Sequence, residues 1–220
     1  MNIIFLFFIL LVFTDSAKII NVTHIYQTDN YPTGCESIST MMCLHYNNIT
    51  LTPEEFIDNY LDKGIFYYKN GQLFGPNPAQ KFVGSPYDEN SYGCYEPVIT
   101  KALNKLIADK NLNYEVKNLT NVKMEDIITN YIDKDIPVIF WATMGMRHFT
   151  YGNAWIVPET EEKFQWRGRE HCLLLVGYDN DNYYFNDPLE KGSPTPYNKT
   201  LVQKRHEEQY SMAVAFVKKS

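Results

Sequence analysis

The chain has 220 residues, of which 45% are hydrophobic and 21% are charged, so its composition is that of an ordinary globular domain and not of a disordered chain. Its 20 Lys and Arg residues against 26 Asp and Glu residues give a formal net charge of −6. Nucleic-acid-binding proteins carry a basic excess or a basic stripe, and neither is visible here, so we expect no nucleic-acid partner.

The N-terminus carries an unbroken apolar run over residues 3–13. It is too short for a membrane-spanning helix, which needs about 20 residues, and it fits the apolar region of a signal peptide, with small residues following at Ser16 and Ala17. No Lys or Arg precedes the run, so an uncleaved anchor or a buried strand is the alternative. We expect residues 1–17 to be a signal peptide and 18–220 to be a secreted or extracellular domain without stable membrane insertion.

The first half of the chain predicts helices. Apolar residues recur with a 3.6-residue period over 34–46, and Thr52 followed by Pro53 is typical of a capped helix start. A third helix is expected to begin at Pro97, and a fourth to run over 123–133. Between the second and third helices, a segment rich in Gly and Pro over 64–96 predicts a long loop.

The second half predicts strands. Buried strands are expected where apolar and β-branched residues run without interruption, at 137–143, 171–178, 183–187 and 212–218, with a turn over 179–182. Residues 144–170 show no clear period and are expected to be irregular. Helices followed by strands predict an α+β domain with an antiparallel sheet.

Cys35 lies at the start of the first predicted helix. The free backbone N–H groups at a helix N-terminus favour a thiolate, so this position predicts a lowered thiol pKa and a nucleophile. The alternative is a buried cysteine that packs as a small hydrophobe. If Cys35 is a nucleophile it must be unpaired, whereas pairing of Cys43, Cys94 and Cys172 stays open.

His171 begins a predicted buried strand, and Asp187 follows sixteen residues later at the end of the returning strand. A general base needs a group that orients its ring, and a carboxylate does this. Taken singly, a core histidine and a turn-forming aspartate are the simpler interpretations. A regular hairpin with an even turn would put the two side chains on opposite faces, so a triad requires an odd turn or a bulge between them.

Three motifs together carry a resemblance to a known family: residues 27–44 (QTDNYPTGCESISTMMCL), 171–179 (HCLLLVGYD) and 186–188 (NDP). They resemble the bacteriocin-processing (double-glycine leader) peptidase-like family within the papain-like cysteine peptidase superfamily, and segments 93–97 and 135–141 are similar to its stand-alone exported branch. The resemblance implies a papain-like cysteine peptidase fold.

The resemblance also implies roles for four residues. Cys35 would be the nucleophile, His171 the base, Asp187 the residue that orients His171, and Gln27 part of the oxyanion hole. The chain has no phosphate-binding loop of a transport ATPase, so double-glycine specificity is not carried over.

The function we expect is therefore an exported cysteine hydrolase, a peptidase acting on a peptide or protein substrate. The alternative is a catalytically silent or transferase-type domain that binds peptides or cell-wall fragments. No cofactor is expected, and the absence of a CxxC pair argues against a structural zinc site. Glu36 is interpreted as favouring the helix N-terminus. Glu170 is interpreted as a solvated charge, the alternative being contact with His171 from outside the triad.

Overall fold

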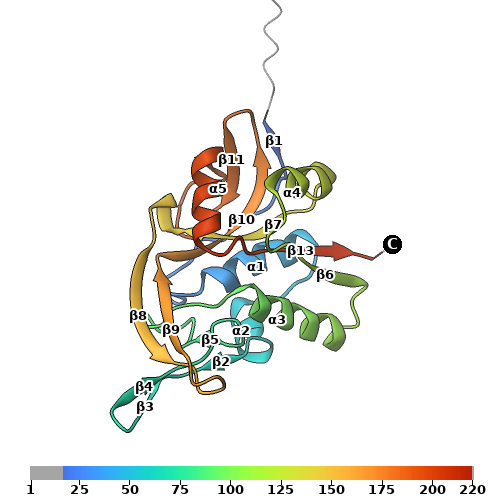
Figure 1. Cartoon of the computed structure of the whole chain (residues 1–220). Coiled ribbons are helices and arrows are strands. Elements are labelled where there is room, and N and C mark those ends of the chain that lie inside the picture. The colour runs from blue at the N-terminus through green and yellow to red at the C-terminus, as the bar shows by residue number, and fades with distance from the viewer. Residues whose placement is uncertain (1–16, 220) are drawn as a thin grey trace, which may run out of the picture.

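A computed structural model describes residues 17–219, so the predicted signal peptide lies, apart from Ala17, outside the described residues. The centre of the molecule is a seven-stranded antiparallel sheet with helices on both faces (Figure 1). The strand order is β12-β11-β10-β7-β13-β6, and β1 pairs with β10. The bounds are β1 Lys18–Ile19, β6 Tyr114–Asn118, β7 Val138–Thr143, β10 Glu170–Tyr178, β11 Asn182–Asn186, β12 Thr195–Asn198 and β13 Ala213–Lys218.

The first helix, α1 (Cys35–Tyr46), packs against β10 and β7 and is buried from Cys35 to Leu44. The hydroxyl of Ser39 donates to the backbone oxygen of Cys172 at 3.0 Å, which ties α1 to β10 at the level of the predicted nucleophile. The other helices are α2 (Pro53–Asn59), α3 (Glu96–Asp109), α4 (Met124–Asn130) and α5 (Lys199–Glu208), with short 3₁₀ turns η1 (Ile132–Lys134) and η2 (Met144–Met146).

A second, four-stranded sheet extends from the body as an arm (Figure 1). It consists of β3 (Tyr67–Lys69), β4 (Gln72–Phe74), β8 (Thr150–Ile156) and β9 (Lys163–Gly168), while β2 (Lys63–Gly64) pairs with β5 (Phe82–Val83). The prediction that residues 144–170 are irregular is therefore wrong. The long loop predicted over 64–96 contains the three short strands β3, β4 and β5, and β2 ends at its first residue. Aromatic packing, with Trp155 and Phe164 at 4.9 Å between ring centroids, stabilises the arm.

The predicted α+β domain with an antiparallel sheet is confirmed, as are the four predicted helices and four predicted strands within a few residues. The capping box at Thr52 is present, with its side chain accepting from the Glu55 N–H. The sequence did not indicate α5, because only Val202 and His206 of its ten residues are buried and no apolar stripe is visible. It also did not indicate β6 and β12, which lie at the two ends of the strand order.

The β10–β11 hairpin contains the irregularity that the predicted triad requires. The register shifts by one residue at Val176, so that Leu174 pairs with Asn186. Because side chains alternate along a strand, Asp187 then lies on the same face of the hairpin as His171. The expectation of a bulge between these two positions is confirmed.

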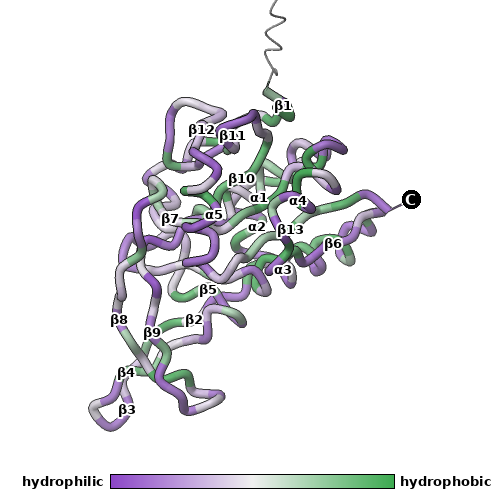
Figure 2. Tube along the Cα trace, turned by 45° about the horizontal axis from the view of Figure 1, so that its top comes forward, coloured by the Kyte–Doolittle hydropathy of each residue, from purple (hydrophilic) through white to green (hydrophobic). Residues whose placement is uncertain are grey.

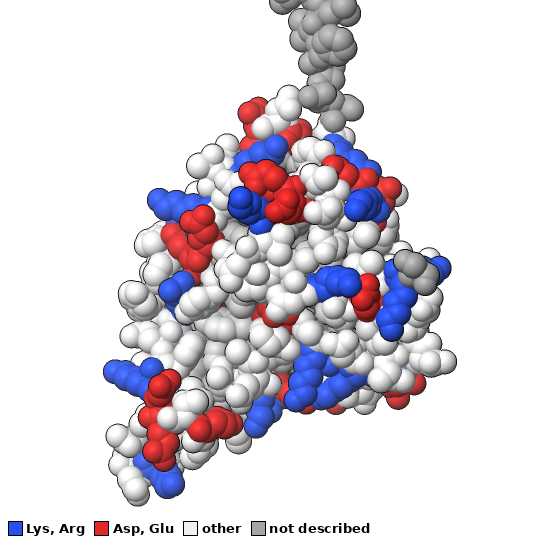
Figure 3. Space-filling view, turned by 45° about the vertical axis from the view of Figure 1, so that its right-hand side comes forward, with Lys and Arg blue, Asp and Glu red and all other residues white. Residues whose placement is uncertain are grey.

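Hydrophobic stretches gather in the middle of the molecule, at α1, β10 and β13 (Figure 2), and these elements hold much of the buried core. On the face shown in Figure 3, basic and acidic side chains are interspersed, without a stripe of one sign. Within residues 17–219, no helix has the length and hydrophobicity needed to cross a membrane.

Candidate active site

Cys35 is the first residue of α1 and is 5% exposed, at the base of a cleft. As the first helical residue, its backbone N–H has no acceptor within the helix and is available to a ligand. The Cys35 Sγ accepts a hydrogen bond from the Cys172 N–H at 3.4 Å. All four cysteines are free thiols, so the expectation that Cys35 is unpaired is confirmed.

His171 and Asp187 form a buried pair. The Nε2 of His171 lies 2.7 Å from Oδ1 of Asp187, whose Oδ2 accepts from the Tyr197 hydroxyl at 2.9 Å. Burial alone would raise the pKa of Asp187, but the hydrogen bond and charge of His171, with the Leu189 N–H and the Tyr197 hydroxyl, outweigh it and lower that pKa. With Nε2 donating to the carboxylate, neutral His171 keeps a lone pair on Nδ1, which has no partner.

Gln27 lines the same cleft and is 6% exposed. Its backbone N–H donates to Pro188 O at 2.7 Å, which fastens this part of the N-terminal segment to the residue that follows Asp187. The side-chain Oε1 is buried without a partner. Gln27 is therefore held by its backbone, while no side chain in the described part of the chain bonds to its amide oxygen.

Glu36 and Glu170 lie beside the thiol. Glu36 is in the first turn of α1, as interpreted from the sequence, whereas the interpretation of Glu170 as a solvated charge is wrong. Glu36 is 0% exposed, accepts from the Cys94 N–H at 2.5 Å and accepts from the Cys35 thiol at 3.4 Å. Glu170 is 3% exposed, and among residues 17–219 neither of its carboxyl oxygens has a partner at hydrogen-bonding geometry. Sequence gave no signal for this pair, because the two residues come together only when β10 packs against α1.

The carboxyl groups of Glu36 and Glu170 help to raise the pKa of the Cys35 thiol, whereas the sequence predicts a lowered pKa. Burial, then the charges of Glu36 and Glu170, raise the pKa of Cys35 well above its usual value, although the Cys172 N–H acts in the opposite direction. Burial also raises the pKa of Glu36 to about 7, and burial with the charge of Glu36 raises the pKa of Glu170. The prediction of a lowered thiol pKa from the helix N-terminus is wrong for this arrangement, in which burial and the two carboxyl groups raise that pKa.

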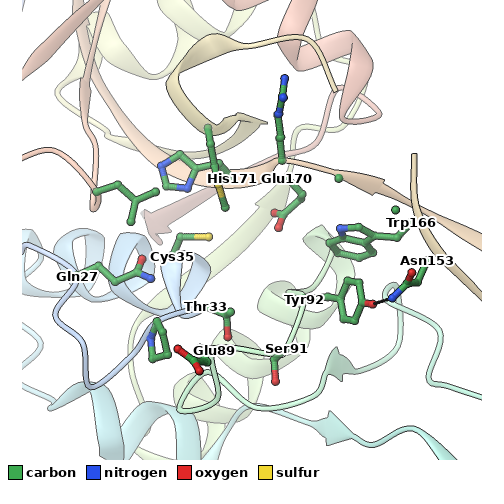
Figure 4. A pocket seen from close by; sticks show the side chains of 16 residues that line it. Gln27, Thr33, Cys35, Glu89, Ser91, Tyr92, Asn153, Trp166, Glu170 and His171 are labelled. Atoms are coloured by element: carbon green, nitrogen blue, oxygen red, sulfur yellow. Dashed lines mark hydrogen bonds between the residues drawn. The ribbon is translucent and has the colours of Figure 1, made fainter. Parts of the chain in front are cut away.

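The cleft has a volume of about 580 Å³ (Figure 4). Cys35, His171 and Gln27 line one part of it, and Tyr92, Asn153 and Trp166 from the arm and the preceding loop line another. Asn153 donates to the Tyr92 hydroxyl at 2.6 Å, which joins β8 to the loop before α3. The arm, expected to be irregular, thus supplies a wall of the cleft.

Figure 4 shows the sulfur of Cys35 directed toward the Glu170 side of the cleft, with Gln27 and the His171 ring on its other side. Within the described residues, no hydrogen bond joins Cys35 and His171. The arrangement is thus a neutral thiol held by Glu36 and the Cys172 N–H, next to an imidazole whose Nδ1 is free.

The whole of this arrangement falls within residues 19–214, which match the model of the Peptidase_C39 like family. The chain belongs to that family. A crystal structure from Bacillus anthracis, of a protein named as a C39-like peptidase, superposes with a TM-score of 0.79 and 25% identity and covers 94% of this chain and 100% of that one. The fold is therefore papain-like, as the sequence motifs implied.

A curated relative is the uncharacterized protein YvpB of Bacillus subtilis strain 168. It is 26% identical to this chain over 186 residues, which are 84% of this chain and 69% of YvpB.

Proposed function

We propose that this chain is a cysteine peptidase that hydrolyses peptide bonds through Cys35, His171 and Asp187. The observation that carries the proposal is the buried His171–Asp187 hydrogen bond of 2.7 Å, which leaves the second ring nitrogen free beside a helix N-terminus that carries a cysteine. This is the arrangement in which an oriented imidazole can take a proton from a nucleophile. Membership of a peptidase-like family supports the same reaction class.

The mechanism begins with a rotation of the Cys35 side chain from the Glu170 side toward His171. Nδ1 of His171 takes the thiol proton, and the sulfur attacks the carbonyl carbon of the substrate. The Cys35 N–H and the Gln27 amide stabilise the oxyanion that forms. His171 then protonates the leaving amine, and water hydrolyses the acyl-enzyme with His171 as base.

We propose further that the protein acts outside the cell, after removal of the apolar N-terminal segment 3–13. N-terminal sequencing of the exported protein tests this directly, and a mature N-terminus near Ala17 is the expected result. An intact Met1 would contradict it.

One observation favours the alternative, a domain that binds peptides without turnover. The thiol is directed away from His171 and lies beside two carboxyl groups, which disfavour the thiolate. In that case Cys35 would remain a neutral thiol when a peptide occupies the cleft, and its replacement would leave peptide binding unchanged.

Cleavage profiling on a proteome-derived peptide library distinguishes the two functions. The wild-type protein is compared with Cys35→Ala and with Cys43→Ala, which removes another buried thiol of α1. We expect cleavage by the wild type and by Cys43→Ala, none by Cys35→Ala, and an acyl adduct on Cys35 in single-turnover mass spectrometry. Cleavage by Cys35→Ala at the wild-type rate would refute the proposal, and binding without any adduct would favour the silent domain.

A further inference from the structure

The Cys35 thiol and the carboxyl groups of Glu36 and Glu170 form a buried cluster that the proposed hydrolysis does not use as a whole. One potential ligand atom from each residue lies within 4.8 Å of the others. Among the described residues, no Lys, Arg or His forms an ion pair with either carboxyl group. Buried carboxylates without a cation are costly, so the cluster must hold protons or a positive ion.

The surroundings of the Glu170 carboxyl group indicate a place for a positive ion. The Trp141 indole N–H favours the charged form of Glu170, but it donates to Cys94 O at 3.0 Å, and within residues 17–219 neither oxygen of the buried Glu170 carboxyl has a partner at hydrogen-bonding geometry. Buried polar atoms are nearly always partnered, so two free oxygens on one carboxyl group need an explanation. The Glu170 carboxyl is directed at the Cys35 sulfur in the close view of the cleft (Figure 4).

Gly93 keeps the space between the carboxyl groups clear. A Cβ at this position would lie 2.6 Å from Oε1 of Glu36 and 2.7 Å from Oε2 of Glu170. Glycine here therefore allows Oε1 of Glu36 and Oε2 of Glu170 to approach the backbone at Gly93, which keeps the two carboxyl groups close together. Glu36 is also held in place, because its Oε1 accepts from the Cys94 N–H while its Oε2 faces the thiol, which resembles the outer hydrogen bonding of metal ligands.

One of the three distances between these ligand atoms is compatible with a small divalent cation. In a tetrahedral zinc site with a sulfur at about 2.3 Å and an oxygen at about 2.1 Å, the two ligand atoms are about 3.6 Å apart. The Cys35 Sγ and the Glu36 Oε2 are 3.4 Å apart. One thiolate with two carboxylates is a ligand set for zinc, since magnesium and calcium prefer oxygen alone.

We propose that Cys35, Glu36 and Glu170 form a binding site for a divalent transition-metal cation such as Zn²⁺. We propose further that a bound ion inhibits the protein, because the metal-bound sulfur of Cys35 can no longer attack a substrate. Cys35 and Glu170 both line the cleft, so an ion can enter from there. On binding, the thiol proton and the protons held by the carboxyl groups pass to solvent, and a sulfur–metal bond replaces the S–H bond. Binding does not depend on the proposed peptidase activity, whereas the inhibition rests on it.

The first test is binding of Co²⁺ and Zn²⁺ to the metal-free protein. Cobalt titration is followed by thiolate-to-cobalt charge-transfer absorption, and zinc is measured by calorimetry and by competition with cobalt. We expect one ion per chain for both metals and none with Mg²⁺ or Ca²⁺. An absence of charge-transfer absorption together with an absence of zinc binding would overturn the proposal.

Variants locate the site. Cys35→Ser should abolish the charge-transfer absorption, and Glu170→Gln or Glu36→Gln should weaken zinc binding by more than the roughly 10- to 100-fold cost of losing an outer-shell partner. Glu170→Gln is isosteric and removes a buried charge, so its fold should be retained, as circular dichroism will check. Cys43→Ser and Glu96→Gln are matched controls, a buried thiol and a buried carboxyl away from the cluster.

Unchanged zinc affinity in Glu170→Gln, or a charge-transfer band that survives Cys35→Ser, would overturn the three-residue site. A second measurement, the alkylation rate of Cys35, distinguishes a wrong metal site from a wrong proposed function. Bound zinc should protect Cys35 from alkylation by iodoacetamide, which requires no turnover. Protection without inhibition of a measured peptidase activity would refute the proposed nucleophile and leave the metal site standing, and alkylation at the metal-free rate would refute the metal site.

Discussion

The Nε2 atom of His171 lies 2.7 Å from Oδ1 of Asp187, and the bulge at Val176 is what brings both side chains onto one face of the hairpin. Because Asp187 acts by orienting His171, we expect His171→Ala to lower single-turnover acylation by about 10²–10⁴-fold and Asp187→Ala to lower it less. Asp187→Asn retains an acceptor for the His171 N–H and should be the mildest of the three.

The control for this series is Tyr184→Phe on the same strand, β11, because the Tyr184 hydroxyl binds Asp179 at the turn and not the site. Acylation by Tyr184→Phe should equal that of the wild type. If Asp187→Ala acylates as fast as the wild type, Asp187 has no part in the reaction.

Gln27 should stabilise the oxyanion in the transition state and should not change the reactivity of the Cys35 thiol. Removal of one oxyanion donor costs roughly 10²–10³-fold in turnover, and we expect Gln27→Ala to lose this much while iodoacetamide still alkylates Cys35 at the wild-type rate. Asn30→Ala, a change in the exposed turn that follows Gln27, is the control. Equal turnover of wild type and Gln27→Ala would remove Gln27 from the site.

The carboxyl pair should hold back formation of the thiolate. Because the charges of Glu36 and Glu170 raise the pKa of Cys35, replacing both with Gln should lower that pKa and speed alkylation of Cys35 near neutral pH. Each unit by which the pKa falls increases the thiolate fraction about tenfold while the pH is below that pKa. Rates are measured at pH values between about 6 and 9, in the presence of a chelator.

The matched control for the thiolate prediction is Glu96→Gln, a buried carboxyl of α3 whose side chain binds Asn118 and Thr100. Its alkylation profile should follow the wild type. A double variant that reacts no faster than the wild type at any pH would show that burial alone sets the reactivity of Cys35.

His206 should make stability depend on acid pH. Its ring is buried, stacks on Phe140 at 3.9 Å between centroids, and binds Trp141 O through Nδ1 at 2.8 Å. Burial lowers the pKa of His206 from 6.5 to about 4. The unfolded chain therefore takes up a proton before the folded protein does, and the stability present above pH 6.5 is lost as the pH falls toward 4, on the order of 3 kcal/mol.

Urea unfolding of wild type and His206→Leu at a series of pH values tests this. Raised carboxyl pKa values such as that of Glu36 act with the opposite sign, since their stability is lost as pH rises from 4.5 to about 7, so the comparison between the two proteins is the informative quantity. The wild type should lose more free energy of unfolding on acidification than His206→Leu does. Parallel pH profiles would contradict the assignment.

Replacement of Gly93 by Ala should destabilise the protein, for two reasons. Its φ of 152° is unfavourable for other residues, and a Cβ would meet Glu36 and Glu170. Gly71 has a φ of 76° with nothing within 4 Å of its Cβ position, so Gly71→Ala measures the cost of a left-handed backbone without a contact, about 1 kcal/mol. Gly93→Ala should cost about 1–3 kcal/mol more, because its φ is less favourable for Ala and because of overpacking, and thermal unfolding of the two variants gives the difference. Equal costs would mean that the carboxyl groups move aside freely.

Much of the fold was readable from local sequence, because the relevant signals are local. The periodicity over 34–46, the cap at Thr52 and the apolar runs of β7 and β10 reflect burial of one face or of a whole strand, and the structure has these elements. The need for a bulge between His171 and Asp187 was likewise predictable, since it follows from the alternation of side chains.

Only the packing of distant segments decided the surroundings of Cys35. In the sequence, Glu36 fits the first turn of a helix and Glu170 looks like a surface charge. They become buried neighbours because β10 packs on α1, with Gly93 close to both carboxyl groups. Burial and the two carboxyl charges then raise the thiol pKa that the helix N-terminus was expected to lower. The helix position is encoded within a few residues, whereas desolvation and charge proximity depend on which parts of the chain meet in space.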